Sequence, residues 1–297
     1  MVDTLCPSCG SRSPDVLDVL TDQRRRYSCQ RCGEVWVAGD PQPVPRAAGG
    51  RRPAVQAYSR SRADFPTPEQ VEPDRRARVE ALKARFLAEH PAPEPRVAEF
   101  WATYQRVFAE DGLDRADPKA FHFFANSPVG AYAGQMTVFN NEWKDLGPRE
   151  GARRVAESVR FLLYGPEDQV IEDRLTYLVQ PGCPIGMKGW KEALLTKVLC
   201  IVEPDRFLPI VTYGSPDVGK RALARSIWGL ELPAADRTSM TLGRLVVWSN
   251  DLLRALAGDG FAHAEHASSF LWWAKDFAGD LAGAAPARAA GGSASRR

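Results

Sequence analysis

Four of the six cysteines lie near the N-terminus in two Cys-x-x-Cys pairs with 19 residues between them: Cys6 with Cys9, and Cys29 with Cys32. A Cys-x-x-Cys turn lets two thiolates reach one metal ion, and two such turns complete the tetrahedral shell of four sulfurs that zinc favours. A closed four-sulfur shell has no open position for a substrate, so we expect one structural Zn²⁺ ion and no chemistry at the metal.

Short strands are expected to position these cysteines. Residues 16–20 and 34–37 are rich in valine, and a glycine directly follows each pair, where a tight turn favours it. Residues 1–38 therefore resemble a zinc ribbon, a small β unit that the metal ion allows to fold without a large hydrophobic core. The resemblance implies docking on nucleic acid or on protein.

Three consecutive arginines, Arg24, Arg25 and Arg26, precede Tyr27 and the second cysteine pair. Guanidinium groups neutralise phosphates and an aromatic face stacks on a base, so this run predicts a contact with nucleic acid. The alternative is that the arginines are solvated and that Tyr27 only covers the ribbon.

Charge is unevenly distributed along the chain. The net charge is only +2, but residues 41–63 carry five basic and no acidic side chains, whereas residues 64–282 carry 26 basic and 31 acidic ones. Proline and glycine recur through residues 39–74, so we predict a disordered basic linker there, and a disordered tail at 283–297. Such a linker can neutralise phosphates or serve only as a solubilising spacer.

Residues 75–282 are expected to form an all-helical domain. Apolar residues recur there at spacings of three and four, as at Val97, Trp101, Tyr104 and Phe108, and no long segment alternates apolar with polar residues. The fold class is thus mainly α, with a small β zinc ribbon at the N-terminus. No apolar run approaches the roughly 20 residues of a membrane helix and no signal sequence is visible, which favours the cytoplasm.

A glycine-rich segment of this domain, between a helix expected to end near residue 179 and one expected to start near residue 188, has the composition of a phosphate-binding loop. Its candidate contacts are three glycines and two lysines: Gly182, Gly186, Gly189, Lys188 and Lys191. Backbone N–H groups of such a loop and the following helix N-terminus can bind a phosphate. The segment resembles the hairpin of helix-hairpin-helix DNA-binding proteins, and the residues after it are similar to those of DNA glycosylases. The alternative is a connection between helices that binds nothing.

The glycosylase resemblance implies a catalytic aspartate after the apolar run, but Thr212 stands at that position. Threonine cannot act as a general base or stabilise an oxocarbenium ion, and the nearest acids, Asp205 and Asp217, are displaced from it. We therefore assign no catalytic residue. A P-loop at 214–220 is also disfavoured, because Arg221 replaces the hydroxyl that would hold magnesium.

Residues from about 119 to 275 also look like the helical recognition regions of McrB-type restriction proteins. The resemblance rests on five short segments: Gly189 through Lys197, Pro204 through Phe207, Gly219-Lys220, Ser249 through Leu253, and Phe270 through Trp273. It implies recognition of DNA without cleavage. Because the chain lacks the GTPase module of those proteins, a motor ATPase or nuclease would be a separate partner.

Three further patterns have both a structural and a functional interpretation. His263 and His266 have helical spacing but no third metal ligand, so a helix surface is favoured. Of the adjacent Trp272 and Trp273, one is expected in the core and the other in an interface or groove wall. Residues 127–143 form either an ordered loop or a pocket for a base. Trp143 and the side-chain amides of Gln135, Asn140 and Asn141 would line that pocket.

Together these patterns predict a non-enzymatic DNA-binding or recognition component of a bacterial restriction, defence or DNA-processing system. The alternatives are base excision by a glycosylase-like enzyme and a protein adaptor that docks through the ribbon. DNA and a motor ATPase or nuclease subunit are the expected partners, and no membrane contact is expected.

Overall fold

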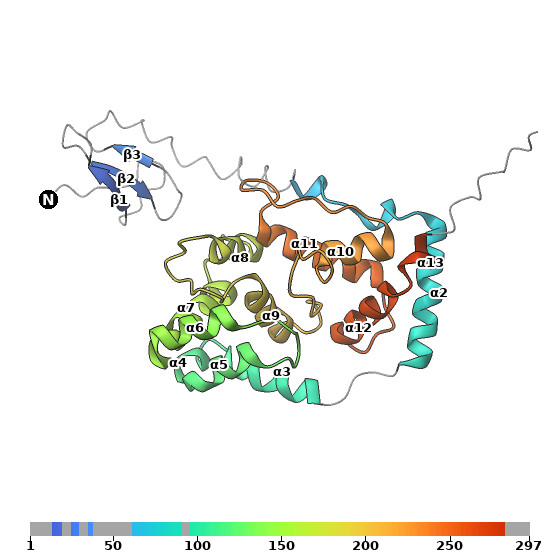
Figure 1. The fold of residues 1–297 in the computed structure, drawn as a ribbon, viewed down its shortest axis with the longest axis horizontal. Helices are drawn as coiled ribbons and strands as arrows, with labels where there is room; N and C mark the ends of the chain where they lie inside the picture. The colour runs from blue at the N-terminus through green and yellow to red at the C-terminus, as the bar shows by residue number, and fades with distance from the viewer. Residues whose placement is uncertain (1–13, 20–24, 30–34, 38–60, 91–95, 283–297) are drawn as a thin grey trace, which may run out of the picture. The chain divides into compact units, whose positions relative to one another are not determined.

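The computed structural model describes residues 14–19, 25–29, 35–37, 61–90 and 96–282 of the chain (Figure 1). These residues belong to two compact units, one within residues 1–59 and one within residues 60–297. The described residues of the first unit are strands, and those of the second are mainly helical. No helix in the described ranges is long and apolar enough to span a lipid bilayer.

The first unit is a three-stranded antiparallel sheet in the order β1-β2-β3, formed by β1 (Pro14–Val19), β2 (Arg25–Cys29) and β3 (Val35–Val37). Strands β1 and β3 overlap the two segments in which the sequence predicts strands, whereas β2 was not predicted. The register pairs Tyr27 of β2 with Val16 on one side and Trp36 on the other. Tyr27 is buried.

The second unit is built from helices, most of which the 3.6-residue periodicity predicts. Proline stands at the first positions of α2, α5 and α7, where its missing N–H costs nothing. The elements in chain order are η1 (Pro68–Gln70), α2 (Pro73–Glu89), α3 (Arg96–Val107), α4 (Gly112–Arg115), α5 (Pro118–Asn126), α6 (Thr137–Leu146), α7 (Pro148–Tyr164), α8 (Ile171–Val179), α9 (Glu192–Val202), α10 (Lys220–Leu223), the π-helical turn η2 (Ala224–Trp228), α11 (Leu242–Ala257), α12 (Ala264–Lys275) and α13 (Ala278–Ala282).

This helical body has two halves, each built around a cluster of buried aromatic rings. Helices α3 to α9 surround the first cluster, in which the rings of Phe108 and Phe124 lie 4.8 Å apart between centroids. Helices α2 and α10 to α13 surround the second, in which Phe86 of α2 lies 5.6 Å from Phe270 of α12. Helix α8 packs along α11 and joins the halves (Figure 1).

The helical body begins earlier in the sequence than residue 75. Phe65 and Val71 are buried, and the Arg62 guanidinium lies 5.3 Å from the ring centroid of Trp248 in α11. Residues 61–74 therefore pack on the body instead of belonging to the predicted linker. Isolated apolar anchors among prolines produce no periodic pattern, which is why the sequence does not mark this boundary.

The π-helical turn η2 is stabilised by an arginine from a distant helix. Arg75 of α2 donates hydrogen bonds to the carbonyl oxygens of Ile227 (2.9 Å), Ser226 (2.7 Å) and Arg225 (3.5 Å). These carbonyls lie at the end of a helical segment, where backbone donors run out: the Gly229 N–H donates to the Arg225 carbonyl oxygen at 3.0 Å, and Arg75 supplies donors to the other two. Arg75 thus ties α2 to η2 across 150 residues of sequence.

Candidate functional site

The predicted zinc site lies mostly outside the described residues. Cys29 is the last residue of β2, whereas Cys6, Cys9 and Cys32 fall outside the described ranges. Arg25 and Arg26 are the first two residues of β2, four and three positions before Cys29, and Arg24 lies outside the described ranges. The strand therefore places two of the predicted nucleic-acid contacts on the same short element as one predicted zinc ligand.

Lys191, a predicted phosphate ligand, forms hydrogen bonds within the glycine-rich loop. Helix α9 begins at Glu192, so Lys191 is its N-cap residue, and the helix starts four residues later than predicted. The Lys191 ammonium donates to the carbonyl oxygens of Leu178 (2.9 Å) and Gln180 (3.3 Å), at the C-terminal end of α8. A cation favours this negative end of a helix dipole, so Lys191 closes the loop instead of pointing toward a ligand.

The three glycines shape the same loop. Gly189 has a φ of +77°, and a Cβ atom there would lie only 2.4 Å from the backbone nitrogen of Phe139, so the loop touches α6 at a point where only glycine fits. Gly182 also has a positive φ, but faces open space. The Gly186 N–H donates to the Cys183 carbonyl oxygen at 2.9 Å and is already satisfied.

Lys188 is the predicted phosphate ligand that remains at the surface. Its side chain is 79% exposed, and its ammonium lies 3.2 Å from a carboxylate oxygen of Glu142 in α6. The Glu142 side chain is only 14% exposed, so the pair is open to solvent on the lysine side, and a phosphate that binds Lys188 would have to compete with Glu142. Of the two predicted lysine contacts in the loop, Lys188 is therefore the one whose ammonium stays exposed.

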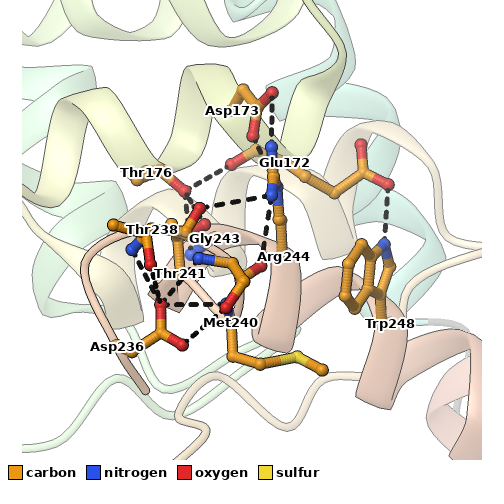
Figure 2. Close-up of polar contacts among 11 residues, drawn as sticks. Glu172, Asp173, Thr176, Asp236, Thr238, Met240, Thr241, Gly243, Arg244 and Trp248 are labelled. Carbon is orange, nitrogen blue, oxygen red and sulfur yellow. Dashed lines mark hydrogen bonds and ion pairs between the residues drawn. The ribbon is translucent and has the colours of Figure 1, made fainter. Parts of the chain in front are cut away.

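A polar network holds α8, and with it the start of the loop, against α11 (Figure 2). Arg244 of α11 forms an ion pair with Asp173 of α8 at 2.9 Å. Next to it, the hydroxyl groups of Thr176 and Thr241 are 2.9 Å apart, and the Gly243 N–H donates to Thr176 Oγ1 at 3.2 Å. The Gly243 contact satisfies one N–H group in the first turn of α11, where N–H groups lack helical partners.

The P-loop-like segment folds on itself. The Lys220 side chain is fully buried, and its ammonium donates to the Val246 carbonyl oxygen of α11 at 2.9 Å. The backbone N–H groups of Gly219, Lys220 and Arg221 donate to carbonyl oxygens of residues 215, 212 and 213. Neither the lysine nor these N–H groups can reach a phosphate, so the structure agrees with the rejection of a P-loop.

The acids considered for glycosylase chemistry are not gathered at Thr212. Asp205 is exposed and lines a cavity of about 750 Å³ together with Asp251 and His263. Asp217 is also exposed, and its backbone carbonyl accepts a hydrogen bond from Lys275. Thr212 lines a different cavity, which contains neither of these two acids.

That second cavity, of about 480 Å³, lies between the two halves of the helical body. Its walls are the loop 128–134, the segment 209–212, Val218 and one side of α12. Helix α12 contributes four side chains to the cavity: Glu265, Ser268, Ser269 and Trp272. The last three follow Glu265 by three, four and seven residues, so all four lie on one stripe of the helix. We call this the Glu265 cavity.

Glu265 is the acid that sequence reasoning missed. Its Oε2 atom is buried and has no hydrogen-bond partner among the described residues, and burial raises the pKa of the carboxyl group above its ordinary value. The helical spacing from Glu265 to Trp272 is visible in the sequence. That these residues line a cavity could not be predicted from it, because the opposite wall is the loop 128–134, which is distant in sequence.

Other predicted groups have structural roles. His263 caps α12 by accepting the His266 N–H at 3.3 Å, and His266 is buried with its Nε2 3.1 Å from the His90 carbonyl oxygen, so the expected helix surface is wrong for His266. No group of three potential metal ligands occurs among the described residues. Trp272 forms a cavity wall, as expected of one tryptophan, whereas Trp273 packs beside Phe86 but is only half-buried, so neither of the pair has the expected core position.

The segment 127–143 contributes to the Glu265 cavity through its first part only. Asn140 and Asn126 exchange side-chain hydrogen bonds of 2.9 and 3.0 Å, and Trp143 is buried. Gln135 is exposed and does not line the cavity. The predicted base-pocket residues are therefore not the ones that form a cavity wall.

No known protein family, no curated protein and no solved structure matches this chain. The residues and their geometry therefore carry the functional argument.

Proposed function

We propose that this chain is a non-enzymatic DNA-binding component of a bacterial restriction, defence or DNA-processing system. In this proposal the zinc ribbon and the basic segment 41–63 attach to the phosphate backbone, and the helical body adds a local contact. The observation that carries the proposal is the segregation of charge: five basic and no acidic residues in 41–63, beside a ribbon whose strand β2 begins with two arginines.

The internal contacts of the body support this division. Several of its surface arginines are paired with carboxylates of the body itself, as in Arg160 with Asp114 at 2.6 Å and Arg153 with Glu150 at 2.7 Å. Residues 64–282 also carry more acidic than basic side chains. A positive field that attracts DNA must therefore come mainly from residues 41–63, with a smaller share from the three arginines of residues 283–297.

The first test measures how duplex DNA binding by the full chain depends on salt. Replacing Arg46, Arg51 and Arg52 with serine should weaken binding and lower the slope of log K against log salt by about 0.9 for each phosphate that the chain no longer neutralises. A control with the same charge change replaces three exposed, carboxylate-paired arginines of the body: Arg115, Arg153 and Arg225. Equal effects of the two triple variants, or binding that salt does not affect, would contradict the proposal.

A second test addresses the glycine-rich loop. Lys188→Ala should weaken DNA binding severalfold and leave the fold intact, because the Lys188 side chain is 79% exposed. Lys144→Ala removes the same charge from an exposed position on α6 and should have less effect. Lys191→Ala is unsuitable as a probe, because it removes two hydrogen bonds that close the loop.

The two alternatives make distinct predictions. A protein adaptor would retain one partner protein after nuclease treatment and show no DNA binding of its own. A glycosylase-like enzyme would release a base or produce abasic sites, and Asp205→Asn or Asp217→Asn would abolish that activity. The structure offers less support for base excision, since neither aspartate lines the cavity that contains Thr212.

A further inference from the structure

The Glu265 cavity combines aromatic walls with apolar side chains that are exposed to solvent. Tyr132 and Val218 line it with 69% and 53% of their surface exposed, and Trp272 is half-buried. The cavity has a volume of about 480 Å³. A ligand that covers these exposed apolar groups removes their surface from water, which favours binding. The walls therefore suit a ligand with an apolar or aromatic body.

The charge of the cavity narrows the class of ligand. Glu265 is the acidic residue among the described residues that line it, and none of those lining residues is basic. Its buried Oε2 has no hydrogen-bond partner among the described residues. A buried acceptor without a donor costs free energy, and because Oε2 itself is closed off, a ligand in the cavity would offset this cost by placing a positive charge beside the carboxyl group. An anion would be repelled by Glu265 and would find no basic side chain among the described residues that line the cavity.

We infer that the Glu265 cavity binds a small organic cation, with a protonated amine at the Glu265 carboxylate and an apolar body against Tyr132 and Trp272. Aromatic faces attract cations as well as apolar groups, so the same walls serve both parts of the ligand. Burial raises the pKa of Glu265, and a bound ammonium would favour its ionised form. This inference goes beyond the proposed function and does not depend on it, because it uses no contact with nucleic acid.

The test compares probes of similar shape and different charge on the full chain: benzylammonium, benzyl alcohol and benzoate. Titrations followed by NMR of the tryptophan indole N–H signals should show binding of benzylammonium, about tenfold weaker binding of benzyl alcohol, and none of benzoate, since tenfold corresponds to about 1.4 kcal/mol for the ion pair. Equal affinity for the alcohol, preference for benzoate, or no binding of benzylammonium overturns the inference.

Variants locate the site. Glu265→Gln should weaken benzylammonium binding about tenfold and leave benzyl alcohol binding unchanged. Asp276→Asn makes the same charge change at an exposed residue after α12 and should change neither. If circular dichroism shows that Glu265→Gln is unfolded, Tyr132→Ala replaces it, because an exposed side chain can be removed without harm to the core. Full benzylammonium affinity in a folded Glu265→Gln variant, or in Tyr132→Ala, overturns the inference.

Discussion

Lys220 provides a quantitative test of the rejected P-loop. Its side chain is fully buried, one hydrogen bond joins its ammonium to the Val246 carbonyl oxygen, and burial lowers its pKa from 10.5 to about 8. A phosphate-binding lysine needs an accessible ammonium, whereas a buried one destabilises the fold while it is charged. Replacing Lys220 with methionine, of similar length and without charge, should therefore stabilise the protein at neutral pH.

The magnitude follows from the two pKa values. A difference of about 2.5 between the unfolded and folded pKa corresponds to about 3 kcal/mol lost to the buried charge well below pH 8. Methionine also forgoes the hydrogen bond to Val246, worth about 1 kcal/mol, and packs imperfectly. We expect Lys220→Met to raise the free energy of unfolding by about 1 to 2 kcal/mol at pH 7.

The pH dependence has a definite sign. Between about pH 8 and 10.5 the unfolded chain keeps the Lys220 proton while the folded chain releases it, so the unmodified protein gains stability as pH rises. The advantage of Lys220→Met should therefore shrink by about 1 kcal/mol between pH 7 and pH 9. Urea unfolding of both proteins at the two pH values measures this, with the exposed Lys144→Met as the control.

Two results would refute this reasoning. One is a Lys220→Met variant less stable than the unmodified protein by more than about 1 kcal/mol, which would mean that the ammonium is a net stabilising partner of the nearby Glu192. The other is a constant difference between pH 7 and pH 9, which would mean that Lys220 does not lose its proton in the folded chain over this range.

Three further outcomes are expected. Arg75→Ala should lower the free energy of unfolding by about 2 to 3 kcal/mol in urea, because three carbonyl oxygens at η2 lose a charged donor, and Arg75→Lys should recover part of it. Gly189→Ala should cost more than about 2 kcal/mol and Gly182→Ala about 1 kcal/mol, since both have positive φ but only the first meets Phe139; matching losses would contradict this. Zinc analysis should find one ion per chain, absent from Cys29→Ser, while the melting of the helical body stays unchanged because it is a separate compact unit.

Helix positions could be predicted from the sequence because each buries one stripe of apolar residues. At the start of α5 the local pattern is plain in the sequence, since Asp117 is a capping acid that accepts the Lys119 N–H at 2.8 Å and Pro118 occupies the first turn. Helix α6 was not predicted, because it contains more polar than apolar residues and therefore shows no clear apolar stripe. The position of Phe65 on the body could not be predicted, because a single buried side chain produces no periodic pattern of apolar residues.

The candidate sites were harder to predict than the fold, for a physical reason. A lysine after a glycine suits a phosphate or a nearby backbone carbonyl equally well, and only the path of the chain decides between them. Lys191 and Lys220 both follow glycine-containing turns, and both donate to carbonyl oxygens of the body. Glu265, in contrast, belongs to no motif, and its importance arises from the absence of a partner among the described residues.

The charge balance of the body makes the DNA-binding proposal stricter. A body with more acidic than basic residues repels DNA, so salt acts in two opposing ways: it screens the attraction of residues 41–63 and also the repulsion of the body. Neutralising Arg46, Arg51 and Arg52 should therefore flatten the salt slope, because screening of the body's repulsion then offsets more of the attraction that remains. Binding by that variant should weaken less steeply than binding by the unmodified chain as salt rises from about 20 to 100 mM. A slope that stays equally steep would place the phosphate contacts elsewhere, on the arginines of the ribbon or on the body, where Lys188 would be the first residue to examine.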